Sequence, residues 1–326
     1  MKNSLESDSV ANLRPVQAGD HVYLIDGSTF IFRAYFAMFK AAQARGRSFT
    51  RSDGTPVGAV MAFCNMLWKI VREGIDGADA RPTHLAVVFD PKGGTFRNEI
   101  YPEYKANRSP APEELKRQFQ WCRQWVRALG ISEVASDRHE ADDLIGSLAT
   151  FHRNEQTRIV ILTADKDLAQ LIRENDIWWS YATGQQLNYR SLIKRFGVKP
   201  EQIADQLAIA GDKVDNIPGI PGVGMTLAGR LLTKFGDIAN LRNNLDEVKK
   251  MKFRGAERIM GLLKQHEAIL DISAQLTSIY CDIKEMKQLQ TETSAADLGV
   301  IQSMMDYHQM GERRQQQWLD LIETRK

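Results

Sequence analysis

The chain has 326 residues, of which 43% are hydrophobic and 26% are charged, and its formal net charge is +2. These values are typical of a water-soluble globular protein with one large domain or two smaller ones. Residues 1–19 lack the apolar core of a signal peptide, and every apolar run is shorter than the roughly 18 residues that span a bilayer. We therefore expect a cytoplasmic protein with no membrane partner and a disordered tail over residues 1–19.

Three cysteines, Cys64, Cys122 and Cys281, lie far apart in the sequence and form no CxxC pair. This spacing predicts neither a disulfide framework nor a zinc site, and it fits a reducing compartment. Because a free cysteine usually packs as a small hydrophobic residue, we expect all three to be structural.

From about residue 20 to residue 181, short apolar runs alternate with helical patterns. The runs cover residues 22–25, 85–89 and 159–162, and they have the length and composition of buried, mostly parallel strands. Strands that alternate with helices predict an α/β fold, with a mostly parallel central sheet flanked by helices.

The clearest helix covers residues 113–129, between Pro112 in its first turn and Gly130 after its end. Trp121 and Trp125 lie one turn apart beside its apolar stripe. They could stack on bases, but the favoured interpretation is that they widen the packed face of the helix.

From about residue 188, strand-like runs give way to helical patterns. A glycine-rich hairpin over residues 219–224 joins a helix that ends near Ala210 to a helix over residues 226–234. We predict an α/β core over residues 20–187, a helical subdomain over 188–290 and a helical extension over 291–326. The possible anchors of the extension are Leu298, Ile301, Met305, Trp318 and Ile322.

Basic residues are concentrated in three stretches of the chain. Residues 28–51 contain five basic residues and no acid, residues 92–127 contain eight against four acids, and residues 225–264 contain nine against four. A basic surface beside an acidic pocket suits a polyanionic substrate that is brought to metal ions. Taken alone, each stretch is better explained by basic side chains that solvate helix faces.

Nine carboxylates form five short clusters, and three of the clusters begin where a predicted strand ends. In parallel sheets, ligand sites form beyond the carboxyl ends of the strands. Carboxylates gathered there repel one another unless cations lie between them. The nine residues are Asp26, Asp90, Glu140, Asp142, Asp143, Asp165, Asp167, Asp212 and Asp215.

The residue types in these clusters favour hard metal ions. Glu140 and Asp143 share one helix face, while Asp165 and Asp167 follow a strand two residues apart. Oxygen ligands without a His or Cys cluster favour Mg²⁺ or Mn²⁺. So many carboxylates can hold two ions roughly 4 Å apart, the arrangement that cleaves phosphodiester bonds. One or two of the nine could support ligands without binding metal.

Two further motifs point to nucleic acid. A glycine-rich hairpin between helices is typical of a helix-hairpin-helix, which binds duplex phosphates without reading bases, although the hairpin alone could be an ordinary tight turn. Residues 95–108 should overhang the acidic site, where Lys105 and Arg108 could neutralise a scissile phosphate. The residues predicted to contact DNA are Arg33, Tyr35, Arg97, Tyr104, Gly219, Gly222, Gly224 and Thr226.

Five segments resemble the 5′-nuclease domain of bacterial DNA polymerase I, in order and spacing, from about residue 21 to residue 282. The chain is thus similar to the flap endonuclease/5′-3′ exonuclease superfamily. The segments contain Leu24-Ile-Asp26-Gly27-Ser28, Val88-Phe-Asp90 with Thr95-Phe-Arg97, Glu140-Ala-Asp142-Asp143, Thr163-Ala-Asp165-Lys-Asp167, and Gly211-Asp212 with Pro221-Gly222-Val-Gly224.

The resemblance implies a bacterial or phage-type, monomeric 5′ nuclease of DNA replication and repair that acts on 5′ flaps, nicks and 5′ ends. It implies a PIN-like core, a helical arch that admits the single-stranded 5′ arm, and a K⁺ ion at the hairpin. It also implies two Mg²⁺ or Mn²⁺ ions: the first held by Asp26, Asp90, Glu140 and Asp142, the second by Asp143, Asp165, Asp167 and Asp215, with Asp212 nearby.

One departure from the family pattern concerns the hairpin. The lysine common in the family's G-x-K-T-A motif is Met225 here, although Thr226 and Ala228 fit. The sequence leaves open whether the chain is a free-standing nuclease or the N-terminal part of a polymerase I.

The rival hypotheses are a DNA-binding pseudo-nuclease, a toxin-type ribonuclease and a metal-dependent phosphatase. All nine carboxylates are intact, which argues against the pseudo-nuclease. The hairpin argues against the ribonuclease and the phosphatase.

Overall fold

The computed structural model of the chain describes residues 14–46, 49–77 and 80–324. Residues 1–13, most of the segment predicted to be a disordered tail, lie outside the described residues. The chain is already anchored at Arg14, which forms ion pairs with Asp20 at 2.6 Å and with Glu292 at 3.4 Å. Residues 14–19 therefore belong to the folded domain and not to a disordered tail.

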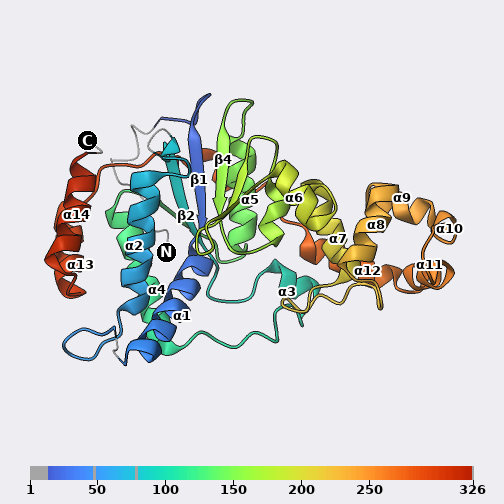
Figure 1. The fold of residues 1–326 in the computed structure, drawn as a ribbon, viewed down its shortest axis with the longest axis horizontal. Helices are drawn as coiled ribbons and strands as arrows, with labels where there is room; N and C mark the ends of the chain where they lie inside the picture. Colours follow the sequence, from blue (N-terminus) through green and yellow to red (C-terminus); the bar gives the residue numbers. More distant parts are fainter. Residues whose placement is uncertain (1–13, 47–48, 78–79, 325–326) are drawn as a thin grey trace, which may run out of the picture.

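A six-stranded sheet forms the middle of the molecule, as Figure 1 shows. Its strand order is β3-β2-β1-β4-β5-β6, and all neighbours are parallel except β5 and β6. The predicted mostly parallel sheet is confirmed. The strands are β1 (His21–Asp26), β2 (His84–Phe89), β3 (Ser132–Ala135), β4 (Arg158–Leu162), β5 (Ile177–Ser180) and β6 (Gln185–Asn188).

The register of the three central strands brings their carboxyl ends to one edge. Asp26 of β1 lies opposite Val88 of β2, and Ile25 lies opposite Leu162 of β4. The residues that follow β2 and β4 therefore emerge beside Asp26.

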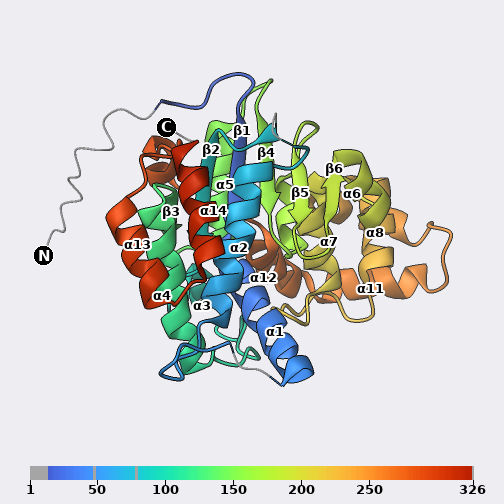
Figure 2. The same cartoon turned by 60° about the vertical axis from the view of Figure 1, so that its left-hand side comes forward.

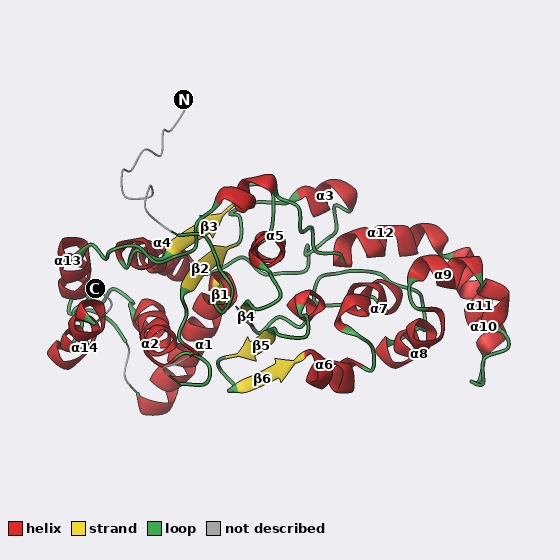
Figure 3. Cartoon of the chain, turned by 90° about the horizontal axis from the view of Figure 1, so that it is seen from above, coloured by secondary structure: helices red, strands yellow, loops and turns green. Residues whose placement is uncertain are grey.

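The side chains of β1 alternate between two hydrophobic layers. Tyr23 and Ile25 pack with α1 (Gly27–Arg45), α2 (Gly58–Glu73) and α4 (Glu113–Ala128). Val22 and Leu24 pack with α5 (Ala141–His152) on the other face. Figure 3 shows the helices in these two layers on either side of the strands. The predicted helix over residues 113–129 is confirmed within one residue as α4.

The described chain after β6 is helical apart from its loops and turns, as predicted, and most of its helices form an arm beside the sheet (Figure 1). The predicted helices on either side of the hairpin are α7 and α8. The helices of the arm are α6 (Tyr189–Phe196), α7 (Ile203–Ala210), α8 (Met225–Phe235), α9 (Ile238–Asn243), α10 (Leu245–Val248), α11 (Ala256–Gln265) and α12 (Glu267–Thr277).

The C-terminal helices α13 (Leu298–Tyr307) and α14 (Glu312–Glu323) return to the sheet domain and cover α2 and α4 (Figure 2). Trp318 is fully buried, and its ring meets that of Trp125 edge-on at a centroid distance of 5.5 Å. Trp125 is therefore a core residue, as favoured. Of the five predicted anchors, Leu298 is 39% exposed, whereas Ile301, Met305, Trp318 and Ile322 are buried.

The predicted helical arch contains little helix. Between β2 and α4, the chain forms one short helix, α3 (Phe96–Ile100), followed by turns and extended loop. This segment is interrupted by glycine and proline, which both disfavour a continuous helix, at Gly93, Gly94, Pro102 and Pro110. We call residues 91–112 the bridging segment.

None of the described helices combines the length and apolar character that a membrane span requires.

Candidate active site

Three elements carry four carboxylates to the edge where β1, β2 and β4 end. Asp26 is the last residue of β1, and its side chain accepts a hydrogen bond from Thr29 N at the start of α1. Asp90 follows β2, and its Oδ1 accepts from Ala141 N at 3.0 Å in the first turn of α5. Glu140 caps the same helix, and Asp142 lies in its first turn. These contacts tie the end of β1 to the start of α1 and the end of β2 to the start of α5.

The loop between α7 and the hairpin adds the last pair of carboxylates. Asp212 and Ile217 form an antiparallel bridge, which closes the loop around Asp215. The bridging segment docks on this loop, because Lys105 N donates to Asp215 O at 3.0 Å and Asn216 Nδ2 donates to Glu103 O at 2.8 Å. The site is therefore built where the sheet domain, the bridging segment and the helical arm meet.

The carboxylate of Asp26 is fixed between two donors. Thr29 N lies 2.9 Å from its Oδ1, and Thr163 Oγ1 lies 2.8 Å from its Oδ2. Burial, and then the neighbouring charge of Asp90, raise the pKa of Asp26 to about 6. The protein thus holds this carboxylate in place although its negative charge is disfavoured.

Three further carboxylates are also held where their charge is disfavoured. Burial, and then the charge of Asp165, raise the pKa of Asp142 well above its ordinary value and that of Asp167 to about 8. Burial likewise raises the pKa of Asp165, and Asp215 adds to this effect. Oδ1 of Asp167 is buried without a hydrogen-bond partner. Cations between these oxygens would relieve both the repulsion and the unsatisfied acceptor.

Besides Arg97, whose Nη1 lies 3.3 Å from Glu140 Oε2, three basic side chains contact the carboxylates directly. Lys105 Nζ lies 2.8 Å from Glu140 Oε1 and 3.8 Å from Asp215 Oδ2, and Arg108 also pairs with Asp215. Lys166 Nζ lies 2.7 Å from Asp212 Oδ2. Burial opposes the charge of Lys105, but Glu140 and its neighbours outweigh burial and raise the pKa of Lys105 above its usual value. Lys105 is therefore a cation in this site.

The structure gives Asp143 a different place from the eight other carboxylates. Both of its oxygens accept from the Arg97 guanidinium at 2.7 Å, and its side chain is fully buried. Arg97 also donates to the backbone oxygens of Leu276 and Ser278. This ion pair joins α5 to the end of α12. A metal-binding role for Asp143 does not fit these contacts, since no oxygen is left free of the guanidinium.

Three residues predicted to contact DNA lie inside the protein. Arg97 is 2% exposed, in the pair with Asp143, and Tyr104 is 4% exposed, with its hydroxyl donating to Glu140 Oε2 at 3.0 Å. Gly219 is buried, and a Cβ there would lie 2.2 Å from Gly211 N. We therefore revise these predictions: Arg97 and Tyr104 organise the acidic site, and Gly219 permits the close approach of two backbone segments.

The other predicted DNA-contacting residues are at least partly accessible. Gly222, Gly224 and Thr226 are exposed at the hairpin and the start of α8. Arg33 is exposed on α1, where Tyr35 is half-buried and donates a hydrogen bond to Glu114. These residues keep the positions that a surface contact requires.

A hollow of about 980 Å³ opens beside Asp90, between the bridging segment, α1 and α4. Its lining includes the aromatic rings of Phe32, Phe89 and Phe119 together with basic side chains, among them Lys92 and Arg123. The combination of aromatic and basic lining suits single-stranded nucleic acid.

Sequence reasoning missed three polar residues that support the site. Thr163 donates to Asp26, Ser28 Oγ accepts from Asp90 N, and Lys166 pairs with Asp212. Each lies within two residues of a predicted carboxylate in the sequence. That proximity was the available signal.

The donor chemistry of the site fits hard divalent cations, although the side chains are not in a coordinating arrangement. Among the described residues, no group of three or more His, Cys, Asp or Glu side chains is placed to hold a metal ion. The oxygen donors themselves fit Mg²⁺ or Mn²⁺, because the carboxylates are buried, mutually repelling and in one case unsatisfied. Metal binding would require Lys105 and Arg108 to release Glu140 and Asp215 from their ion pairs.

Comparison with known proteins identifies relatives for most of the chain. A family model for the N-terminal resolvase-like domain of 5′-3′ exonuclease matches residues 21–197, and one for the 5′-3′ exonuclease C-terminal SAM fold matches residues 198–297. The chain is 38% identical to DNA polymerase I of Rhizobium leguminosarum, over 87% of this chain and 27% of that protein. It is 31% identical to the 5′-3′ exonuclease of Aquifex aeolicus, over 89% of this chain and 92% of that protein.

Solved structures share the fold. T5 5′-exonuclease with bound zinc ions superposes with a TM-score of 0.62 and 18% identity, covering 89% of this chain and 98% of that one. The catalytic core of Rad2 in complex with a DNA substrate has a TM-score of 0.57 and 14% identity, covering 96% and 97%. By length, the chain spans about a quarter of its DNA polymerase I relative and nearly all of its exonuclease relative.

Proposed function

Because the chain belongs to the 5′-3′ exonuclease family, we propose that it is a divalent-metal-dependent 5′ nuclease that hydrolyses DNA phosphodiester bonds, both as an exonuclease and as a 5′-flap endonuclease. The observation that carries the proposal is the set of eight carboxylates, several of them buried and mutually repelling, where the ends of β1, β2 and β4 meet the loop after α7. We further propose a role in DNA replication and repair, because its relatives include a DNA polymerase I, and the cytoplasm as its setting. We propose that it acts as a monomer.

The residues at the sheet edge would hold two ions, Mg²⁺ or Mn²⁺. Asp26, Asp90, Glu140 and Asp142 would hold the first, and Asp165, Asp167 and Asp215 the second, with Asp212 nearby. Bound there, such ions lower the pKa of an attacking water and stabilise the charge on the attacking and leaving oxygens. Asp143 would not take part directly, because it is committed to Arg97. Its role would be to hold the first turn of α5 in position.

Lys105 and Arg108 would exchange their partners when substrate binds. In the free protein, their charges are balanced by Glu140 and Asp215. A scissile phosphate would offer the same kind of oxygen acceptor, and its negative charge grows in the transition state. Lys105 and Arg108 would then be catalytic through electrostatic stabilisation, while Tyr104 keeps Glu140 in place.

The hairpin would bind the duplex portion of the substrate. Gly222, Gly224 and Thr226 are exposed beside the first turn of α8, where backbone N–H groups attract phosphates. A K⁺ ion bound at this hairpin would add a further positive charge. Because such contacts reach phosphates and not base edges, affinity should fall steeply with salt and depend little on sequence.

The test is cleavage of a labelled DNA duplex that carries a single-stranded 5′ flap, with Mg²⁺ and with EDTA. We expect incision at the flap junction or one nucleotide inside it, only with metal. Asp142→Ala and Asp165→Asn should abolish cleavage while binding of the flap duplex in Ca²⁺ persists. Asp137→Asn, which removes an exposed acid close to Asp90, serves as the matched control and should stay active. Tight binding without cleavage in Mg²⁺ or Mn²⁺ would favour the pseudo-nuclease instead.

A further inference from the structure

Arg258 lies beside the exposed hairpin and has no counterion there. If Gly222 carried a Cβ, that atom would lie 2.9 Å from Nη2 of Arg258. Arg258 is exposed, and it forms no hydrogen bond or ion pair within the described part of the chain. By contrast, Arg242 pairs with Asp271, and Arg230 donates to Lys252 O. The guanidinium thus stands next to the hairpin without an anionic partner.

The helix that carries Arg258 is anchored in the hydrophobic core. Arg258 lies in the first turn of α11, and the next residue, Ile259, is buried together with Leu263. Both belong to the same hydrophobic cluster as Ala228 and Leu231 of α8. The segment that precedes α11 also contacts α8, because Arg230 Nη2 donates to Lys252 O at 3.0 Å. Together with the close approach of Arg258 to Gly222, these contacts place the start of α11 beside the hairpin.

The hairpin receives no cation from position 225. Met225 is half-buried and packs against that hydrophobic cluster, and its carbonyl accepts from Gln206 Nε2. Its side chain is therefore part of the packing of α8 and offers no charge to a ligand. Residues 219–224 contain no basic side chain either.

The guanidinium of Arg258 places a positive charge beside a glycine turn and the first turn of a helix, which are themselves partly positive. Exposed N–H groups and a helix N-terminus both carry partial positive charge, so an unpaired arginine next to them is unfavourable unless an anion is shared between them. Arginine also suits phosphate, because its planar fork can donate two parallel hydrogen bonds.

We infer that Arg258 is a phosphate-binding residue of the hairpin, and that it supplies from α11 the cation which position 225 does not provide. This inference rests on the proposed function, because the phosphate is that of the DNA duplex. It extends the proposed function by assigning one phosphate contact of the duplex to a side chain that lies outside the hairpin.

The test measures binding of a 5′-flap duplex in Ca²⁺ by fluorescence anisotropy over a range of KCl concentrations. Arg258→Ala should weaken binding roughly tenfold and reduce the slope of log K against log salt by about 0.9, the loss expected for one phosphate contact. Arg258→Lys should retain part of the affinity. Adding Met225→Lys to Arg258→Ala should restore most of the affinity, because it returns a cation to the hairpin from the other side.

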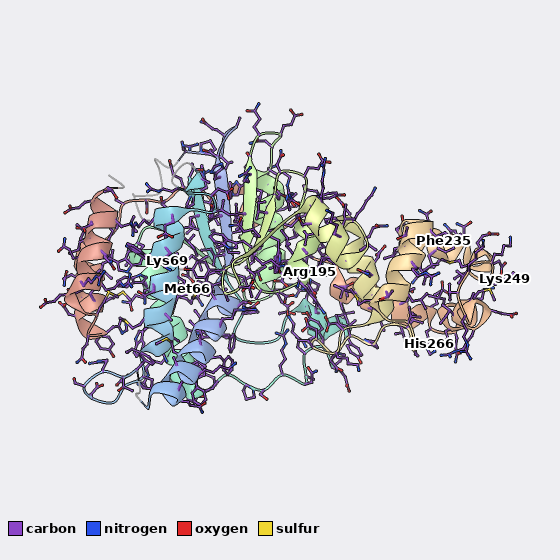
Figure 4. All side chains as sticks on the ribbon, in the orientation of Figure 1. Met66, Lys69, Arg195, Phe235, Lys249 and His266 are labelled. Carbon is purple, nitrogen blue, oxygen red and sulfur yellow. The ribbon has the colours of Figure 1, made fainter. Side chains whose placement is uncertain are left out.

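Lys249→Ala is the matched control. Lys249 is exposed after α10, at the outer end of the arm, as Figure 4 shows. Lys249→Ala removes one positive charge, as Arg258→Ala does, but at a site far from the hairpin. It should therefore change the affinity for the flap duplex less than about twofold. Equal effects of Arg258→Ala and Lys249→Ala, or no rescue by Met225→Lys, would overturn the inference. The proposed function would fail separately, if the unmodified protein neither bound nor cleaved the flap duplex.

Discussion

Replacing Asp143 with alanine should destabilise the protein, whereas replacing its neighbour Asp142 with asparagine should stabilise it in EDTA. The two residues are adjacent in the first turn of α5, yet their surroundings are opposite in charge. Asp143 is paired through both oxygens with buried Arg97, while Asp142 faces Asp165 and Asp26. One substitution removes an attraction, and the other removes a repulsion.

The magnitude for Asp143 follows from what the substitution leaves behind. Alanine would leave the guanidinium of Arg97 buried, at 2% exposure, without the carboxylate that balances its charge. Breaking a buried ion pair in this way typically costs about 3–5 kcal/mol, a large part of the roughly 5–15 kcal/mol that stabilises a domain. For Asp142, the raised pKa means that the folded state disfavours the charged form, so a neutral side chain of similar shape should raise the free energy of unfolding.

Urea unfolding followed by tryptophan fluorescence would measure both effects, because the chain contains six tryptophans. With a slope of about 2 kcal/mol per molar urea, Asp143→Ala should lower the midpoint by roughly 1.5–2.5 M. In EDTA, the midpoint of Asp142→Asn should be equal to or above that of the unmodified protein. With Mg²⁺, the unmodified protein should gain more stability than Asp142→Asn, because metal binding stabilises the folded state by mass action. An unchanged midpoint for Asp143→Ala, together with loss of metal binding, would refute our description of the Arg97 pair.

The remaining predictions concern one cation, one core residue and one histidine. Lys105→Ala should slow single-turnover cleavage at least roughly tenfold, about 1.4 kcal/mol of barrier, and an unchanged rate would remove Lys105 from the chemistry. Trp318→Ala should cost about 3–5 kcal/mol in calorimetry, because the ring is fully buried against Trp125, while the cleavage position stays the same below the unfolding temperature. Burial, and then the charge of Arg51, lower the pKa of His308 to about 4. Between pH 4 and 6.5, the unfolded chain therefore binds more protons than the folded chain. Stability should therefore fall as the pH drops through that window, and His308→Phe should reduce this loss; equal pH profiles in thermal melts would contradict it.

The parts of the site that the sequence predicted are those with a local signature. An apolar run followed by an acidic residue indicates a buried strand and the position of its carboxyl end. Parallel pairing of the strands then brings these carboxyl ends to the same edge of the sheet. This explains why Asp26, Asp90 and Asp165 are correctly placed from the sequence alone. The helical arm followed from the same kind of local pattern, because its periodicity and its glycine hairpin need no knowledge of distant contacts.

The parts that the sequence did not predict depend on pairing between distant segments. Asp143 and Asp142 are indistinguishable as neighbours in a chain, and only the arrival of Arg97, 46 residues away, separates them. Gly219 resembles the other hairpin glycines until its contact with Gly211 is known. Edge strand β6 and the C-terminal helices likewise owe their places to packing, which local composition does not specify.

The charge balance of the site connects the free protein to its proposed activity. Arg97 contacts both Asp143 and Glu140, and its charge balances that of Asp143. In the described residues, the eight other carboxylates meet three further cations, Lys105, Arg108 and Lys166, which leaves a formal charge of −5. Two divalent ions would bring this charge close to zero, whereas one would leave a substantial excess. Lys105 and Arg108 form ion pairs with Glu140 and Asp215, which are carboxylates that the metal ions would need. Binding of the metal ions and binding of the substrate phosphate would therefore be coupled. The phosphate frees the carboxylates by attracting the cations, and the freed carboxylates attract the ions.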